Sequence, residues 1–210
     1  MFRSIVAAVV AAVALCACSH EVKTIASPAT SVRPADGAKL PGSYVLVVQS
    51  DKLIKTVDPS SFTCGGPEYP IDARASFKQS ARDTMIQLVE ALETAEQALT
   101  PEQLQAGKHR GQIVLETTAY DAQLDFNPGL FSATADATVT IGASLIVDGP
   151  AGRLLQAEES DTRTVEHDVV TCGDGAEVLA EANSKATVGL LERLAERFST
   201  APRLRTAALP

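Results

Sequence analysis

The stretch that decides the fold runs from residue 131 to residue 147 and reads FSATADATVTIGASLIV. Apolar residues occupy every second position from Phe131 to Val147, and most positions between them carry threonine, aspartate, serine or glycine. Successive side chains of a β-strand point to opposite faces, so one face of this segment is apolar and the other polar. The pattern predicts a long strand in an antiparallel sheet that is covered on one side only.

Three further segments are expected to pair in the same sheet. Residues 112–126 (QIVLETTAYDAQLDF) precede the long strand, and residues 153–170 (RLLQAEESDTRTVEHDVV) follow it after a turn at 148–150. Residues 43–50 (SYVLVVQS) form a short run of strong strand formers earlier in the chain. The sequence therefore predicts an antiparallel sheet of about four strands.

Two apolar stripes with helical spacing complete the body. Between residues 72 and 95, apolar residues recur every three or four positions, and Asp72 is a candidate N-cap. The second stripe comprises Leu179, Ala182, Ala186, Leu190, Leu194 and Phe198. A capping box at residues 100–103 (TPEQ) predicts a short helix that ends at Gly107. The main order, β-α-β-β-β-α, predicts an α+β two-layer sandwich with two helices on one face of the sheet.

The beginning of the chain divides it into functional segments. Arg3 precedes a continuous apolar run, residues 5–15, which is typical of a secretory signal and shorter than a membrane-spanning helix. Residues 19–42 contain three prolines and two glycines with few large apolar residues, which is typical of a tether. The expected division is a signal peptide over 1–17, a lipidated N-terminus and Pro-rich tether over 18–42, one α+β domain over 43–199 and a polar tail over 200–210.

Two cysteines, Cys16 and Cys18, lie at the end of the apolar run. Leu15-Cys16-Ala17-Cys18 resembles the bacterial lipobox, in which a cysteine after a small residue is acylated and becomes the mature N-terminus. This resemblance implies that Cys18 is lipidated and that the body is anchored to a membrane by acyl chains. Ser19 after that cysteine implies, by the same resemblance, the outer membrane, facing the periplasm. The alternative is ordinary cleavage near Ala17, which leaves Cys18 as an unused thiol.

The composition excludes some classes of function. The formal net charge is −8, whereas nucleic-acid binding needs clustered Lys and Arg. Aromatic residues make up 4% of the chain and tryptophan is absent, so the core has to consist mainly of Val, Leu, Ile and Ala.

Cys64 and Cys172 both lie in glycine-rich turn sequences of the body. In an oxidising compartment this arrangement predicts a Cys64–Cys172 disulfide. The alternative is a reactive or metal-binding pair, which is less favoured because neither cysteine lies in a CxxC motif and no histidine clusters beside Cys64.

Candidate catalytic chemistry centres on His167, which is flanked by Glu166 and Asp168 and followed by Cys172 and Asp174. On a strand, Glu166 and Asp168 share one face and His167 points to the other, so we expect a solvated strand end without a metal site or cofactor. The acidic residues of this segment could bind Ca²⁺, but they lack EF-hand spacing and more often protect a sheet edge; they are Glu158, Glu159, Asp161, Glu166 and Asp168.

The lipobox, the tether and the order of elements together resemble a group of small envelope lipoproteins. This group includes the lipopolysaccharide-assembly lipoprotein that plugs an outer-membrane translocon and the auxiliary lipoproteins of lipid-trafficking ABC transporters. The resemblance implies a non-catalytic accessory or docking module whose partner is an envelope protein or a lipid carrier. The alternative function is a periplasmic enzyme with a site near His167.

Overall fold

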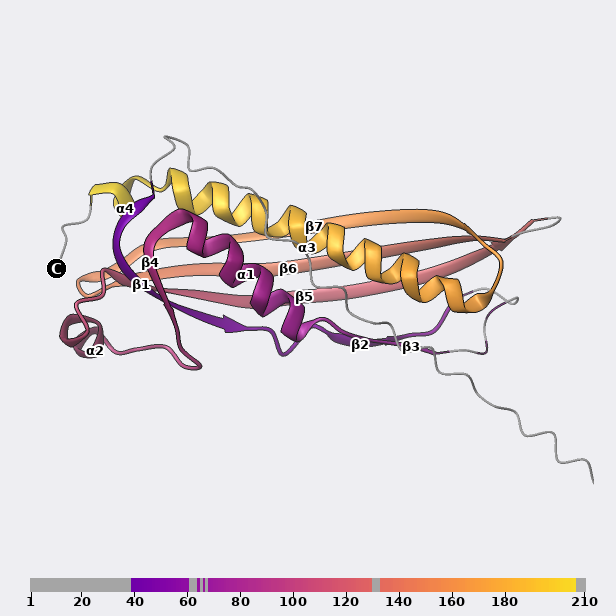
Figure 1. Ribbon diagram of the computed structural model, residues 1–210, viewed down its shortest axis with the longest axis horizontal. Coiled ribbons are helices and arrows are strands. Elements are labelled where there is room, and N and C mark those ends of the chain that lie inside the picture. The colour runs from indigo at the N-terminus through magenta and orange to yellow at the C-terminus, as the bar shows by residue number, and fades with distance from the viewer. Residues whose placement is uncertain (1–38, 61–63, 65, 67, 130–132, 207–210) are drawn as a thin grey trace, which may run out of the picture.

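The computed structural model describes residues 39–60, 64, 66, 68–129 and 133–206. It is an α+β fold in which two helices, α1 and α3, lie on one face of a five-stranded sheet of order β4-β1-β5-β6-β7 (Figure 1). A separate two-stranded sheet pairs β2 with β3. The elements are β1 Leu40–Gln49, β2 Ile54–Val57, β3 Tyr69–Asp72, α1 Arg74–Leu88, β4 Val89–Thr94, α2 Pro101–Ala106, β5 Gly111–Pro128, β6 Ala133–Gly149, β7 Gly152–Val169, a 3₁₀ turn Cys172–Asp174, α3 Gly175–Thr200 and α4 Pro202–Thr206.

Strand β6 confirms the pattern from which the fold was predicted. Its odd-numbered residues from Ala135 to Val147 are fully buried, while Thr138 and Thr140 on the other face are half-buried. β6 pairs antiparallel with β5 and with β7 along almost its whole length. Helix α3 packs on β6 and β7, and the small alanines of β6 allow its close approach.

The prediction of an all-antiparallel sheet of four strands is wrong for the half of the sheet that contains β1, which has parallel neighbours and one additional strand. β1 is parallel to both of its neighbours, β4 and β5. The strand that the prediction lacked is β4. It follows α1 directly, so that β1, α1 and β4 form a parallel crossover unit. A second connection through α2 then returns the chain to the other side of β1, so the sheet is mixed.

Helix α1 ends at Leu88, although the apolar spacing continues to Ala95. Residues 89–94 instead hydrogen-bond to the edge of β1, and this long-range pairing outweighs a weak local helical preference. At the other end the N-cap residue is Ala73, yet Asp72 still acts on the helix terminus. Its carboxylate accepts hydrogen bonds from the Arg74 backbone N–H (3.2 Å) and guanidinium (2.8 Å).

The β2–β3 hairpin was not predicted, because its segment is rich in proline and glycine. It extends the core through Tyr69 and Ile71, together with Leu53 just before β2, and all three side chains are fully buried. Lys55 of β2 forms an ion pair with Asp121 of β5, which holds the hairpin beside the main sheet.

Strand β5 keeps its apolar side toward the helices by means of a β-bulge. Ile113, Leu115 and Thr117 are buried before the bulge, whereas Leu124 and Phe126 are buried after it. The register shift between Thr117 and Ala119 changes the inward positions from odd to even.

The two ends of the predicted domain extend further than expected. β1 begins at Leu40, inside the predicted tether, and residues 202–206 of the predicted polar tail form α4. Leu204 of α4 is buried, and its carbonyl accepts a hydrogen bond from Arg110 (2.6 Å).

The capping box of α2 is confirmed at Thr100 and Gln103. In the described ranges, no helix is long and apolar enough to cross a membrane.

Candidate functional site

The ionisable side chains of the last strand meet those of the last helix along one line, which we call the β7–α3 seam. It comprises Glu159, Asp161, Arg163 and His167 of β7 with Glu181, Lys185, Arg193 and Arg197 of α3. Glu159 binds Arg197 at 2.6 Å, and further along the strand His167 contacts Glu181 at 2.7 Å. The two elements therefore run antiparallel, with an ion pair at one end of the seam and a His167–Glu181 contact at the other.

Asp161 lies at the centre of the seam and is buried. Its side chain is 1% exposed and receives Arg163 at 2.6 Å and Arg193 at 2.7 Å, so both carboxylate oxygens have a cationic partner. Helix α3 approaches it closely at Gly189, where a Cβ atom would lie 2.3 Å from Asp161 Oδ2. The acidic series does lie on an edge strand, but Asp161 does not face solvent there: it points inward and is neutralised by the two arginines.

Arg193 also acts on the edge of the sheet. Besides the ion pair with Asp161, its guanidinium donates a hydrogen bond to the carbonyl of Ser160 at 3.0 Å. β7 is an edge strand, and an unpaired carbonyl on such an edge is a template for another strand. The seam thus joins the helix to the sheet and blocks part of the β7 edge.

His167, the candidate for chemistry, lies on the side of β7 that faces α3. Its ring is half exposed and Nε2 is 2.7 Å from Glu181, which also accepts a hydrogen bond from Lys185 at 2.8 Å. Lys185 first, and then His167, lower the pKa of Glu181. The hollow beside them has a volume of about 260 Å³ and is open to solvent; it is lined by His167, Asp168, Val169, Asp174, Glu177, Val178 and Glu181. Among the described residues, no three His, Cys, Asp or Glu side chains are placed to bind a metal ion.

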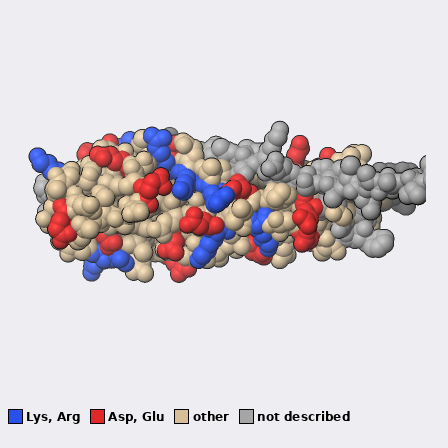
Figure 2. Space-filling view, turned by 90° about the horizontal axis from the view of Figure 1, so that it is seen from below, with Lys and Arg blue, Asp and Glu red and all other residues tan. Residues whose placement is uncertain are grey.

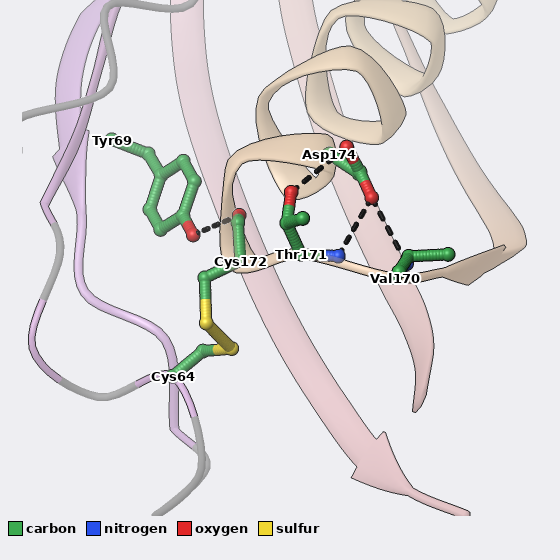
Figure 3. The surroundings of a disulfide bond; sticks show 6 residues. All are labelled: Cys64, Tyr69, Val170, Thr171, Cys172 and Asp174. Atoms are coloured by element: carbon green, nitrogen blue, oxygen red, sulfur yellow. Dashed lines mark hydrogen bonds between the residues drawn. A yellow bond between two sulfur atoms is a disulfide. The ribbon is translucent and has the colours of Figure 1, made fainter. Parts of the chain in front are cut away.

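Cys64 and Cys172 form a disulfide at the same end of the molecule (Figure 3). The sulfur atoms are 2.02 Å apart and the Cα atoms 5.7 Å apart. The hydroxyl of Tyr69 donates to the carbonyl of Cys172 at 2.5 Å, so the chain from Cys64 to β3 is joined twice to the 3₁₀ turn before α3. Asp174 accepts hydrogen bonds from the backbone of Thr171 and Val170, which lower the pKa of its carboxyl (Figure 3).

Sequence reasoning missed the charge pairing of Asp161, although the sequence holds a signal for it. Asp161 has the same parity on the strand as the apolar Val165 and Val169, so it was bound to share their buried face. Arg193 and Arg197 are one helical turn apart on α3, and they pair with Asp161 and Glu159 of β7 respectively. The predicted lipidation site, Cys18, lies outside the described residues.

No family model matches this chain, and no curated protein sequence matches it. Among solved structures, a protein of family DUF330 from Xanthomonas campestris has a TM-score of 0.47 and 11% identity, and covers 80% of this chain and 91% of its own. A minor lipoprotein from Acinetobacter baumannii has a TM-score of 0.36 and 9% identity over 74% of this chain and 90% of its own. Lipoprotein GNA1162 from Neisseria meningitidis has a TM-score of 0.27 and 13% identity over 59% and 84%. At these values none of the three assigns a family or a function to the chain.

Proposed function

We propose that this protein is a non-catalytic, lipid-anchored docking module of the bacterial cell envelope, which serves envelope assembly or lipid transport. The observation that supports this most is the sheet face opposite α1 and α3. On β6 and β7 that face carries a threonine ladder, with Thr138 2.9 Å from Thr164 and Thr140 2.9 Å from Thr162. Beside the ladder, Glu158 and Glu166 are exposed. A broad, ordered polar face of this kind suits contact with another protein better than chemistry on a small substrate.

The anchor in this proposal is Cys18, at the lipobox-like Leu15-Cys16-Ala17-Cys18. We expect metabolic labelling with an alkyne fatty acid to mark the wild-type chain and to leave Cys18→Ser unlabelled, because acylation requires the thiol. Cys16→Ser is the matched control and should still be labelled. Equal labelling of wild type and Cys18→Ser would contradict the anchor.

The alternative function, an enzyme that uses His167, makes a different prediction. Loss of a half-exposed contact such as His167–Glu181 costs at most about 1 kcal/mol, so His167→Ala should fold normally. As a docking module, the protein should tolerate this substitution and rescue a deletion strain fully. A folded His167→Ala protein that fails to rescue would favour the enzyme.

The same strain tests the docking function directly. Glu158→Lys combined with Glu166→Lys reverses exposed charges on the open face, and we expect this variant to fold but to rescue poorly. Shortening the tether within residues 22–36 should also impair rescue, since it reduces the reach of the body from its anchor. Full rescue by the shortened tether together with failure of His167→Ala would overturn the docking proposal.

A further inference from the structure

Strand β1 extends beyond its neighbour β4, and this leaves part of its edge open inside the fold. The β1–β4 pairing ends at Leu46 and Thr94, whereas the pairing of β1 with β5 continues to Gln49. The chain leaves the sheet at Ala95, whose N–H donates to the carbonyl of Leu46 at 2.9 Å. Among the residues that the structure describes, β1 therefore has a paired neighbour on one side only from residue 47 to residue 49.

The backbone of Val48 faces this open edge. In a strand, the N–H and C=O of alternate residues point to the same side, so those of Val48 point where the carbonyl of Leu46 points, toward β4. In the described part of the chain, neither group of Val48 has a hydrogen-bond partner on that side. The Val48 side chain packs on the core and yet is not fully covered. Both features leave room for one more strand.

Helix α1 forms the opposite wall, and the space between it and β1 is the β1–α1 groove. Two adjoining hollows of about 290 Å³ and 730 Å³ make up this groove and share Ala75, Lys78 and Gln79. The smaller is also lined by Leu46, Val48, Arg82, Thr94, Ala95 and Glu96, and the larger by Ser50, Asp51, Asp72, Arg74 and Ser76. The β1 side of the molecule is the one seen in Figure 2, where basic and acidic side chains are mixed.

The α1 wall supplies positive charge in a chain whose net charge is −8. Arg82 makes no ion pair within the described ranges. Lys78 is 3.9 Å from Glu96, whose side chain is 94% exposed, which makes this a weak pair. An occupant with acidic side chains would therefore find two cations, Lys78 and Arg82, beside the partly exposed Val48.

We propose that the β1–α1 groove binds an extended acidic segment of a partner protein, which adds to β1 as a short strand in line with β4. This inference rests on the proposed docking function and adds to it a second surface, separate from the open face of β6 and β7. The backbone of the segment would pair with Val48, an apolar side chain would cover Val48, and a carboxylate would reach Arg82. At about 3.3 Å per residue, the open edge takes about three or four residues.

Hydrogen exchange of the Val48 amide tests this pairing in the full lipidated chain in detergent micelles. The probe is the peptide acetyl-TVEVET-amide, and its control is acetyl-TVKVKT-amide. We expect the Val48 amide to exchange rapidly in the free protein and to slow at least tenfold with the acidic probe only. No slowing with the acidic probe would overturn the proposal. Protection of Val48 without any peptide would also overturn it, because the chain would then fill the groove itself.

The charge of the wall is tested by Arg82→Glu, which should weaken binding of the acidic probe at least tenfold. Arg203→Glu is the matched control, since Arg203 is exposed on α4 and the change in net charge is the same. In the deletion strain, failure of Arg82→Glu with rescue by Arg203→Glu would support the groove. Full rescue by Arg82→Glu, with failure of Glu158→Lys/Glu166→Lys, would overturn the groove and leave docking at the open face.

Discussion

Replacing Cys64 and Cys172 by serine should lower the free energy of unfolding by about 4 to 5 kcal/mol, the largest stability effect that we expect in this protein. The two residues are 108 positions apart, and a cross-link across a loop of this length removes much conformational freedom from the unfolded chain. The hydrogen bond from Tyr69 to Cys172 remains in the variant, so we expect the folded structure to persist.

Urea unfolding of the oxidised protein measures this effect. With a slope of about 2 kcal/mol/M, the midpoint of the double serine variant should fall by about 2 M. Addition of a reducing agent should move the wild type to the same midpoint and leave the variant unchanged, which separates the cross-link from the serine substitutions. Equal midpoints of oxidised wild type and variant would show that the cross-link does not stabilise the fold.

Asp161→Lys should lower the free energy of unfolding by about 3 to 5 kcal/mol, because it places an unpaired charge in a buried position. The new ammonium group would also face Arg163 and Arg193, which now neutralise the carboxylate. Helix α3 packs against Asp161 at Gly189, which leaves no room for a longer side chain at position 161 to turn away without a shift of the helix. We therefore expect helix α3 to lose its fixed position on the sheet.

The matched control is Glu158→Lys, three positions earlier on the same strand. Glu158 is exposed on the opposite face, so this substitution should change stability by about 0.5 kcal/mol or less. Gly189→Leu tests the same contact from the helix and should also destabilise, since its Cβ would lie 2.3 Å from Asp161 Oδ2. Equal unfolding midpoints for Asp161→Lys and Glu158→Lys would contradict the central position of Asp161.

Several features could be predicted from the sequence because they depend on residues close together in the chain. The alternation from Phe131 to Val147 predicted β6 and its buried face, and the capping box predicted the start of α2. The glycine-rich turns around Cys64 and Cys172 favoured the disulfide that the structure contains. The lipidation of Cys18 rests on a local motif as well and stays a prediction.

Other features depended on which distant segments meet, and only the tertiary structure decided them. Residues 89–94 continue a helical pattern, but the edge of β1 offers them backbone hydrogen bonds and makes them β4. The Asp161 side chain is buried, and the position of α3 on the sheet brings Arg193 within 2.7 Å of it. This ion pair offsets the cost of burying the carboxylate. The open edge at Val48 exists because β4 ends three residues before β1 does. Local periodicity therefore determined the antiparallel half and its open polar face, while long-range hydrogen bonding and charge neutralisation determined the parallel half, the pairing of Asp161 and the open edge of β1.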